Sequence, residues 1–330
     1  MSTERPGTLG PLLFWLLAAL LVGALSLRLL GFVKAPPARP APTAGLAVAE
    51  TLTAAADLDL RPIWDNLPET WRAEAEGAVE KLRASANPEL WLLGFHQVER
   101  LAELLALPAE RATGLDQSAR LAALLEDSSD MLASEAVRRA RLRLAAGLRT
   151  IVHSGLDDPD NLAYLDLREL CHSFLPNVEA ELRKLEGQAS ASLLSPERVA
   201  ELRGLSAAGR AAESDVTRFE WTAPTGAGGD LQRTSEIECM QLEGCWVEGN
   251  LVAIVPAWLA AVDRELALWT AAPGSKEAMY ARGMLEALDS GLGELERAAQ
   301  DPIGFDAALD ALMGALVSRA VRHKVSGPFD

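Results

Sequence analysis

The chain begins with one long apolar run, Pro11 to Leu27, that contains no charged residue. At about 1.5 Å per helical residue the run spans roughly 25 Å, and its continuation past Arg28 reaches the length of about 20 residues that a bilayer-spanning helix needs. Trp15 lies near one end, as interfacial aromatic residues often do, and Arg28 can reach the headgroups at the other. The sequence therefore predicts a single transmembrane helix, residues 11–33, preceded by a short tail, residues 1–10.

A cleaved signal peptide is the alternative interpretation of this run. Its apolar core is usually about 7–15 residues long and ends at a small-residue cleavage site. The run here is longer and ends in Arg28-Leu-Leu, although the small residues between Ala41 and Ala49 would permit cleavage. An uncleaved anchor fits the length better.

Two rules conflict over the side of the membrane on which the body lies. Lys and Arg are more numerous after the run, at Arg28, Lys34 and Arg39, than before it, at Arg5. The positive-inside rule then favours a cytoplasmic body. A lone N-terminal anchor followed by a large domain usually keeps its short N-terminus in the cytoplasm instead. We favour that arrangement, which predicts a bacterial inner-membrane protein with a periplasmic body.

The rest of the chain is predicted to be mainly α, a helical bundle body with a small β-hairpin insert. Ala, Leu, Glu and Arg are abundant, and all are strong helix formers. Three pairs of a capping residue and a proline mark helix starts at Asn87, Ser195 and Asp301. A helix from Leu162 to Gly187 is expected to kink or break before Pro176. The predicted segments are a Pro-rich linker, 34–44, a helical domain, 45–213, a β-containing insert, 214–255, and a C-terminal helical segment packing on the first, 256–330.

The insert is predicted because the helical pattern gives way to glycine-rich and β-like segments after residue 213. A Gly-rich loop starts at Thr225, and Gly249-Asn250 is a two-residue hairpin signal between two short β-like runs, Cys245–Glu248 and Leu251–Val255. We expect a small hairpin or three strands, with helices resuming at Pro256.

Charge limits the partners of the body. The chain has 31 Lys and Arg against 47 Asp and Glu. Residues 1–44 contain four of the basic residues and one of the acidic ones, so the formal net charge of residues 45–330 is −19. Nucleic-acid binding needs clustered Lys and Arg, so it is disfavoured, as is attraction to anionic lipid.

No motif predicts a cofactor, a metal or a catalytic centre. The histidines, His96, His153, His172 and His323, lack a second ligand at metal-site spacing. Adjacent helical residues point about 100° apart, so Cys171 and His172 do not converge. The Gly-rich loop lacks the Lys-Ser/Thr of a P-loop, and the aspartates around Pro159 do not match a calcium loop.

Three cysteines are too few for a disulfide framework. Cys239 and Cys245 could pair across a turn in an oxidising compartment, which would leave Cys171 over. The plainer interpretation is that all three are buried free thiols.

Two sets of residues are candidates for binding a partner. One is the only basic concentration of the acidic body, around Arg141; it is either a solvated face of weak ion pairs or a docking stripe for an acidic partner. The other is the aromatic content of the insert, which either covers the core or forms a binding surface. The candidates are Arg138, Arg139, Arg143, Arg149, Phe219, Trp221 and Trp246.

The function that this sequence favours is that of a membrane-anchored accessory or scaffold protein. Its helical body would dock to another envelope protein or complex, or to a second copy. Two alternatives remain: a small-ligand-sensing helical domain, which a closed apolar pocket would favour, and an enzyme with an unrecognised site, which buried carboxylates or histidines of shifted pKa in one cleft would favour.

Overall fold

The computed structural model describes residues 41, 43–125, 134–187, 192–211, 219–225, 229–235 and 239–325. The predicted anchor, 11–33, and all of the spacer up to residue 40 lie outside this part of the chain, so Pro11, Trp15, Leu27 and Arg28 lie outside it too. Within the described ranges, no helix combines the length and the apolar character needed to cross a membrane.

The described chain is mainly helical, as the sequence predicts. The α-helices are α2 (Ala44–Asp57), α3 (Arg61–Asp65), α4 (Glu69–Ser85), α5 (Pro88–Leu105), α6 (Thr113–Asp116), α7 (Ala119–Leu125), α8 (Ser134–Val152), α9 (Leu167–Glu186), α10 (Pro196–Ala211), α11 (Gly249–Trp269), α12 (Lys276–Arg297) and α13 (Pro302–Val325). Two short 3-10 helices span Ala109–Arg111 and Pro159–Tyr164.

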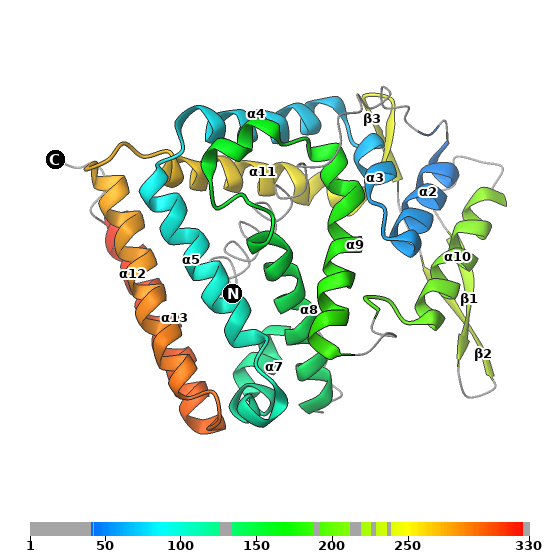
Figure 1. Ribbon diagram of the computed structural model, residues 1–330. Coiled ribbons are helices and arrows are strands. Elements are labelled where there is room, and N and C mark those ends of the chain that lie inside the picture. The colour runs from blue at the N-terminus through cyan, green and yellow to red at the C-terminus, as the bar shows by residue number, and fades with distance from the viewer. Residues whose placement is uncertain are drawn as a thin grey trace, which may run out of the picture.

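The helices surround a central group, α5, α8 and α9, in which α8 packs against both of the others (Figure 1). Helices α4 and α11 pack on each other and lie across one end of this group. Helices α12 and α13 pack on each other, and α12 packs against α5 on one side of the view. Helices α2 and α10 lie side by side at the opposite edge. The C-terminal helices thus share one core with the first helical block.

Trp91 on α5 lies at the centre of the main hydrophobic cluster and is 2% exposed. Its indole N–H donates to the carbonyl of Leu156 at 2.6 Å. Its ring lies 5.3 Å from that of Phe95 and 6.1 Å, edge-on, from that of Trp269 on α11. One side chain therefore joins α5, the loop after α8 and the end of α11.

The three predicted helix starts are confirmed by their caps. The Asn87 side chain accepts from the backbone N–H groups of Glu89 and Leu90, and its amide also donates to Ala271. Ser195 and Asp301 likewise accept backbone N–H groups at the starts of α10 and α13. Of the kink or break expected before Pro176, the break is wrong, because α9 continues through this residue. Pro176 lies on the exposed side of α9, where the carbonyl that lacks an N–H partner can reach water.

The prediction of a hairpin turn at Gly249-Asn250 is wrong. The strands are β1 (Phe219–Thr225), β2 (Gly229–Ser235), β3 (Cys239–Leu242) and β4 (Cys245–Glu248), and they form two antiparallel hairpins, β1–β2 and β3–β4. The second turns at Glu243-Gly244, where both residues have positive φ, 52° and 81°, as a two-residue hairpin loop requires. Gly249 begins α11, so the run from Leu251 to Val255 is helical and Pro256 lies inside a helix.

A close approach between α5 and α11 yields a stability prediction. A Cβ on Gly94 would overlap the ring of Trp269. We expect Gly94→Ala to lower the free energy of unfolding by about 1–3 kcal/mol, because Trp269 is held by its edge contact with Trp91. A Cβ on Gly77 of α4 meets no atom within 4 Å, so Gly77→Ala should instead stabilise by about 0.5–1 kcal/mol. Denaturant titration measures both, and equal shifts would contradict the close approach.

Candidate functional site

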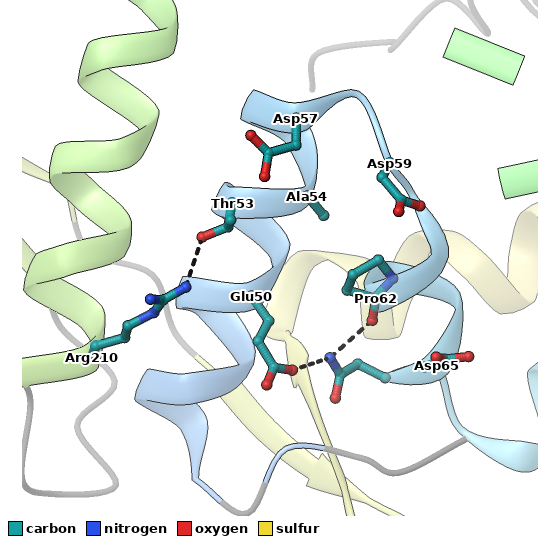
Figure 2. A pocket seen from close by; sticks show the side chains of 9 residues that line it. Glu50, Thr53, Ala54, Asp57, Asp59, Pro62, Asp65 and Arg210 are labelled. Atoms are coloured by element: carbon teal, nitrogen blue, oxygen red, sulfur yellow. Dashed lines mark hydrogen bonds between the residues drawn. The ribbon is translucent and has the colours of Figure 1, made fainter. Parts of the chain in front are cut away.

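An open cleft of about 400 Å³ lies where α2, α3 and α10 meet. Figure 2 shows side chains from all three segments converging on it. Seven of its nine lining residues are polar or charged, and four of them carry carboxylates. The lining residues are Glu50, Thr53, Ala54, Asp57, Asp59, Pro62, Asp65, Asn66 and Arg210.

The α2 wall of the cleft follows from helical spacing. Glu50, Thr53, Ala54 and Asp57 stand at positions i, i+3, i+4 and i+7, which lie on one face of a helix. The other positions of α2 are rich in alanine, and several of these alanines are buried. The polar face of α2 was a signal available in the sequence, and the aspartates that follow it extend that signal; neither was used in predicting the candidate sites.

Asp59 is held by the next basic residue in the chain. Both oxygens of its carboxylate accept from the Arg61 guanidinium, at 3.0 Å from Nε to Oδ1 and 2.5 Å from Nη2 to Oδ2. Burial acts to raise the pKa of Asp59, but the hydrogen bonds and charge of Arg61 outweigh it and hold the pKa below its ordinary value. Asp59 is therefore an ionised, paired carboxylate.

This pairing gives a pH-dependent prediction for Asp59→Asn. A carboxylate whose pKa is lowered on folding stabilises the fold above its unfolded pKa, and the stabilisation is lost as pH falls through the folded value. We expect the variant to be less stable than wild type at pH 7, by at most about 1 kcal/mol because the pair is partly exposed. The difference should shrink below the ordinary pKa of 3.8. Urea titrations at pH 7 and pH 3 measure it, and a difference independent of pH would contradict the pairing.

The other carboxylates of the cleft also have donors. Arg168 of α9 binds both oxygens of Asp65, at 2.6 and 2.7 Å. Arg203 of α10 binds Asp57 at 3.0 Å. Glu50 Oε2 accepts from the Asn66 side-chain amide at 3.1 Å. The cleft is thus a junction of paired polar groups in which the acidic charge is largely matched by neighbouring donors.

The Asn66 side chain binds three different residues at the cleft. Asn66 is 6% exposed. Oδ1 accepts from the N–H of Ala41 at 2.8 Å, and Nδ2 donates to Glu50 and to the carbonyl of Pro62 at 2.9 Å. Ala41 is 3% exposed, so the chain joins the body at a fixed, buried point.

Cys171 and His172 lie beside this cleft but do not form a nucleophilic pair. Burial, with neighbouring aspartates, raises the pKa of the Cys171 thiol to about 12, so it stays protonated at neutral pH. His172 Nδ1 instead faces Asp59 Oδ2 at 3.4 Å.

The other histidines do not gather at one place. His153 faces Glu181 at 3.4 Å and His96 faces Glu99 at 3.8 Å, while the side chain of His323 lies outside the described residues. The part of the chain that the structure describes contains no group of three or more His, Cys, Asp or Glu side chains able to hold a metal ion.

Only part of the predicted arginine stripe forms ion pairs with described residues. Arg138 and Arg139 both bind Glu135 within α8. Hydrogen bonds from Arg138, together with its charge and the contribution of Arg139, lower the pKa of Glu135 to about 2. Arg143 is exposed and Arg149 half-buried, and neither makes an ion pair with a described residue. The exposed part of the stripe is therefore Arg139 and Arg143.

Arg141, in the middle of this concentration, has a different role that was not predicted. It is 1% exposed and binds both oxygens of Asp116, with Nε 2.5 Å from Oδ1. Its Nη1 donates to the carbonyls of Leu105 and Leu107, at 2.5 and 2.9 Å. Helical spacing places Arg141 on the apolar face of α8, four residues after Val137 and three before Leu144. Its partners come from other elements, so the sequence did not show what it binds.

The aromatic candidates of the insert stand on two different hairpins. Phe219 and Trp221 stand on β1, and their side chains lie outside the described part of the structure. Trp246 on β4 is half-buried, and its indole N–H is buried without a hydrogen-bond partner among the described residues. The structure therefore does not bring these three residues into one described surface.

The structure does not bring Cys239 and Cys245 together. Both are buried free thiols, and Cys171 is a partly buried free thiol. In the β3–β4 register Cys239 pairs with Glu248 and Cys245 with Leu242. Paired residues share a face and successive residues alternate, so the two thiols point to opposite faces of the hairpin. Cys245 Sγ instead donates to the carbonyl of Leu67 at 3.5 Å.

No protein-family model, curated protein or solved structure matches this chain.

Proposed function

We propose that this chain is a membrane-anchored accessory or scaffold protein of the bacterial inner membrane. Its N-terminal helix, residues 11–33, would hold it in the bilayer, and its helical body, on the periplasmic side, would dock to another envelope protein or complex. The observation that carries the proposal is the uncharged run from Pro11 to Leu27, followed by a proline spacer.

The contacts of Ala41 support this proposal. A spacer positions a domain only if its far end is attached firmly to that domain. The N–H of Ala41 is bound by the buried side chain of Asn66, and Thr43 caps α2 by accepting from Leu46. The spacer therefore leads directly into packed structure, and we infer that the body is held at a defined distance from the bilayer.

The two alternatives fit the cleft less well. A ligand-sensing bundle would favour a closed apolar pocket between helices, whereas the cleft at α2, α3 and α10 is open and polar. An enzyme would favour unpaired catalytic groups in one cleft, whereas Asp59 and Asp65 are each bound by an arginine. Cys171 beside the cleft stays protonated, because burial raises the pKa of its thiol. The docking proposal requires neither a closed apolar pocket nor a cluster of catalytic groups.

The test uses the full-length protein with a C-terminal affinity tag, cross-linked in native membranes before detergent extraction. We expect one envelope protein, or a second copy of this chain, to be recovered in an amount comparable to the tagged chain. Recovery of the tagged chain alone would contradict the proposal.

A charge-reversal pair then asks whether the arginine stripe carries the docking. Arg139→Glu with Arg143→Glu should reduce partner recovery about tenfold or more, which corresponds to about 1.4 kcal/mol of binding free energy. The matched control is Arg111→Glu with Arg297→Glu, the same change of charge at two exposed positions outside both α8 and the cleft. Undiminished recovery with the α8 pair would remove the stripe from the docking surface.

A further inference from the structure

Helices α2 and α10 form a unit, which we call the arm. The hydroxyls of Thr53 and Ser206 lie 2.7 Å apart, and Ser206 also donates to the carbonyl of Ala49 at 3.0 Å. A Cβ on Gly209 would lie 3.1 Å from the carbonyl of Gly45, so the two backbones are nearly in contact. Because these contacts are short and lie along both helices, α2 and α10 must move together.

The chain passes from the arm to α3 through one unusual residue, while α10 also packs against β1. Helix α2 ends at Asp57, and Leu58 follows with φ 57° and ψ 24°, the left-handed conformation. Many helices end on a residue in this conformation, but glycine usually occupies it, so a leucine there is strained. Here the backbone N–H groups of Leu58 and Asp59 bond back to the last turn of α2. The change of direction between α2 and α3 is therefore concentrated at a single residue.

The cleft described above is the gap between the arm and α3. Glu50, Asp57 and Arg210 line it from the arm, and Asp59, Pro62 and Asp65 line it from the other side (Figure 2). The hydrogen bond from Asn66 Nδ2 to Glu50 Oε2 joins the segment after α3 to the arm, so it crosses the gap.

Asn66 connects the two sides with a buried side chain. Its Oδ1 holds Ala41, which precedes the arm, and its Nδ2 holds Glu50 on the arm and Pro62 on its own side. Arg203 and Asp57, in contrast, pair within the arm, and Arg61 and Asp59 pair outside it. The ion pairs of Asp57 and Asp59 thus each form on one side of the cleft and do not cross it. Helix α2 also touches β4, but the direct side-chain hydrogen bond across the cleft is that of Asn66.

We propose that the arm is hinged at Leu58 and that Asn66 is the latch that holds the arm against α3. Loss of the Asn66 contacts then lets the arm turn away from α3 and widens the cleft. Opening rotates α2 and α10 together and breaks neither helix. Because the same side chain holds Ala41, a displacement of the chain at Ala41 acts directly on the latch. The hinge itself does not depend on what lies before Ala41, so its test is separate from that of the proposed function.

The experiment measures distances by pulsed electron paramagnetic resonance on the full-length protein in detergent. Spin labels are placed by Ala208→Cys on α10 and Ala180→Cys on α9, both exposed positions, with the three native cysteines replaced by alanine. A second pair, Ala180→Cys with Ala307→Cys on α13, lies outside the arm. In Asn66→Ala we expect the first distance distribution to broaden and shift to longer distance, while the second stays as in the protein with Asn66 intact.

Two substitutions at Glu50 keep the proposal testable if Asn66→Ala does not fold. Glu50→Ala removes one contact of the latch and should broaden the first distribution, whereas Glu50→Gln keeps an oxygen that can accept from Asn66 and should leave it unchanged. An unchanged first distribution in both Asn66→Ala and Glu50→Ala would overturn the proposal. Equal broadening of both label pairs would overturn it too, since it would indicate general loosening and not a hinge.

Discussion

Replacing Arg141 with leucine is expected to lower the free energy of unfolding by about 3–5 kcal/mol, the usual cost of breaking a buried ion pair. The substitution leaves the Asp116 carboxylate buried without its cation and leaves the carbonyls of Leu105 and Leu107 without this donor. These groups belong to the end of α5 and to α6, so the loss affects the region where those elements meet α8. Urea unfolding followed by circular dichroism measures it.

Two controls make this result specific. Arg139→Leu, two residues away on the exposed face, should change stability by less than about 0.5 kcal/mol. The double variant Arg141→Leu with Asp116→Leu should recover a large part of the loss, because a buried ion pair can often be replaced by apolar side chains. If Arg141→Leu behaves like Arg139→Leu, the buried network is not present in solution.

Trp91→Ala should have a comparable effect, a loss of about 3–5 kcal/mol. It empties the centre of the main cluster, removes the contacts with Phe95 and Trp269, and leaves the Leu156 carbonyl without its indole donor. Thermal and urea unfolding should both show the loss.

Trp91→Phe separates these contributions. It keeps an aromatic ring in the cluster but removes the indole N–H, so it should cost less than Trp91→Ala, about 1–3 kcal/mol for the buried carbonyl left unpaired. Equal effects of the two substitutions would mean that the hydrogen bond to Leu156, and not the packing of the ring, accounts for the stability.

Local signals in the sequence predicted much of the helical architecture. The starts of α5, α10 and α13 depend on a capping side chain that bonds to backbone two or three residues ahead, and such contacts are legible in the residue order itself. The mainly helical body with a small β-hairpin content followed from composition and periodicity.

The hairpin was misplaced because two turn signals compete within a few residues. Gly249-Asn250 is a strong turn dipeptide, but Glu243-Gly244 takes the turn and Gly249 starts a helix. The apolar run after Gly249 suits a strand or a buried helix equally by composition. Packing of α11 against α4 decides between them, with Leu259 and Trp71 in one cluster, and this contact joins residues far apart in the sequence.

The cleft and Arg141 were missed although the sequence held part of the signal for each. The polar face of α2 and the position of Arg141 on the apolar face of α8 both follow from helical spacing. Their partners do not, because Asp65 is paired with Arg168 and Arg141 with Asp116, on other elements.

Extraction of native membranes at alkaline pH tests the central claim most directly. The full-length polypeptide should stay in the membrane pellet after carbonate washing, and a variant lacking residues 11–33 should appear in the supernatant. Quantitative recovery of the intact, full-length chain in the aqueous fraction would contradict the anchor and the docking function proposed with it.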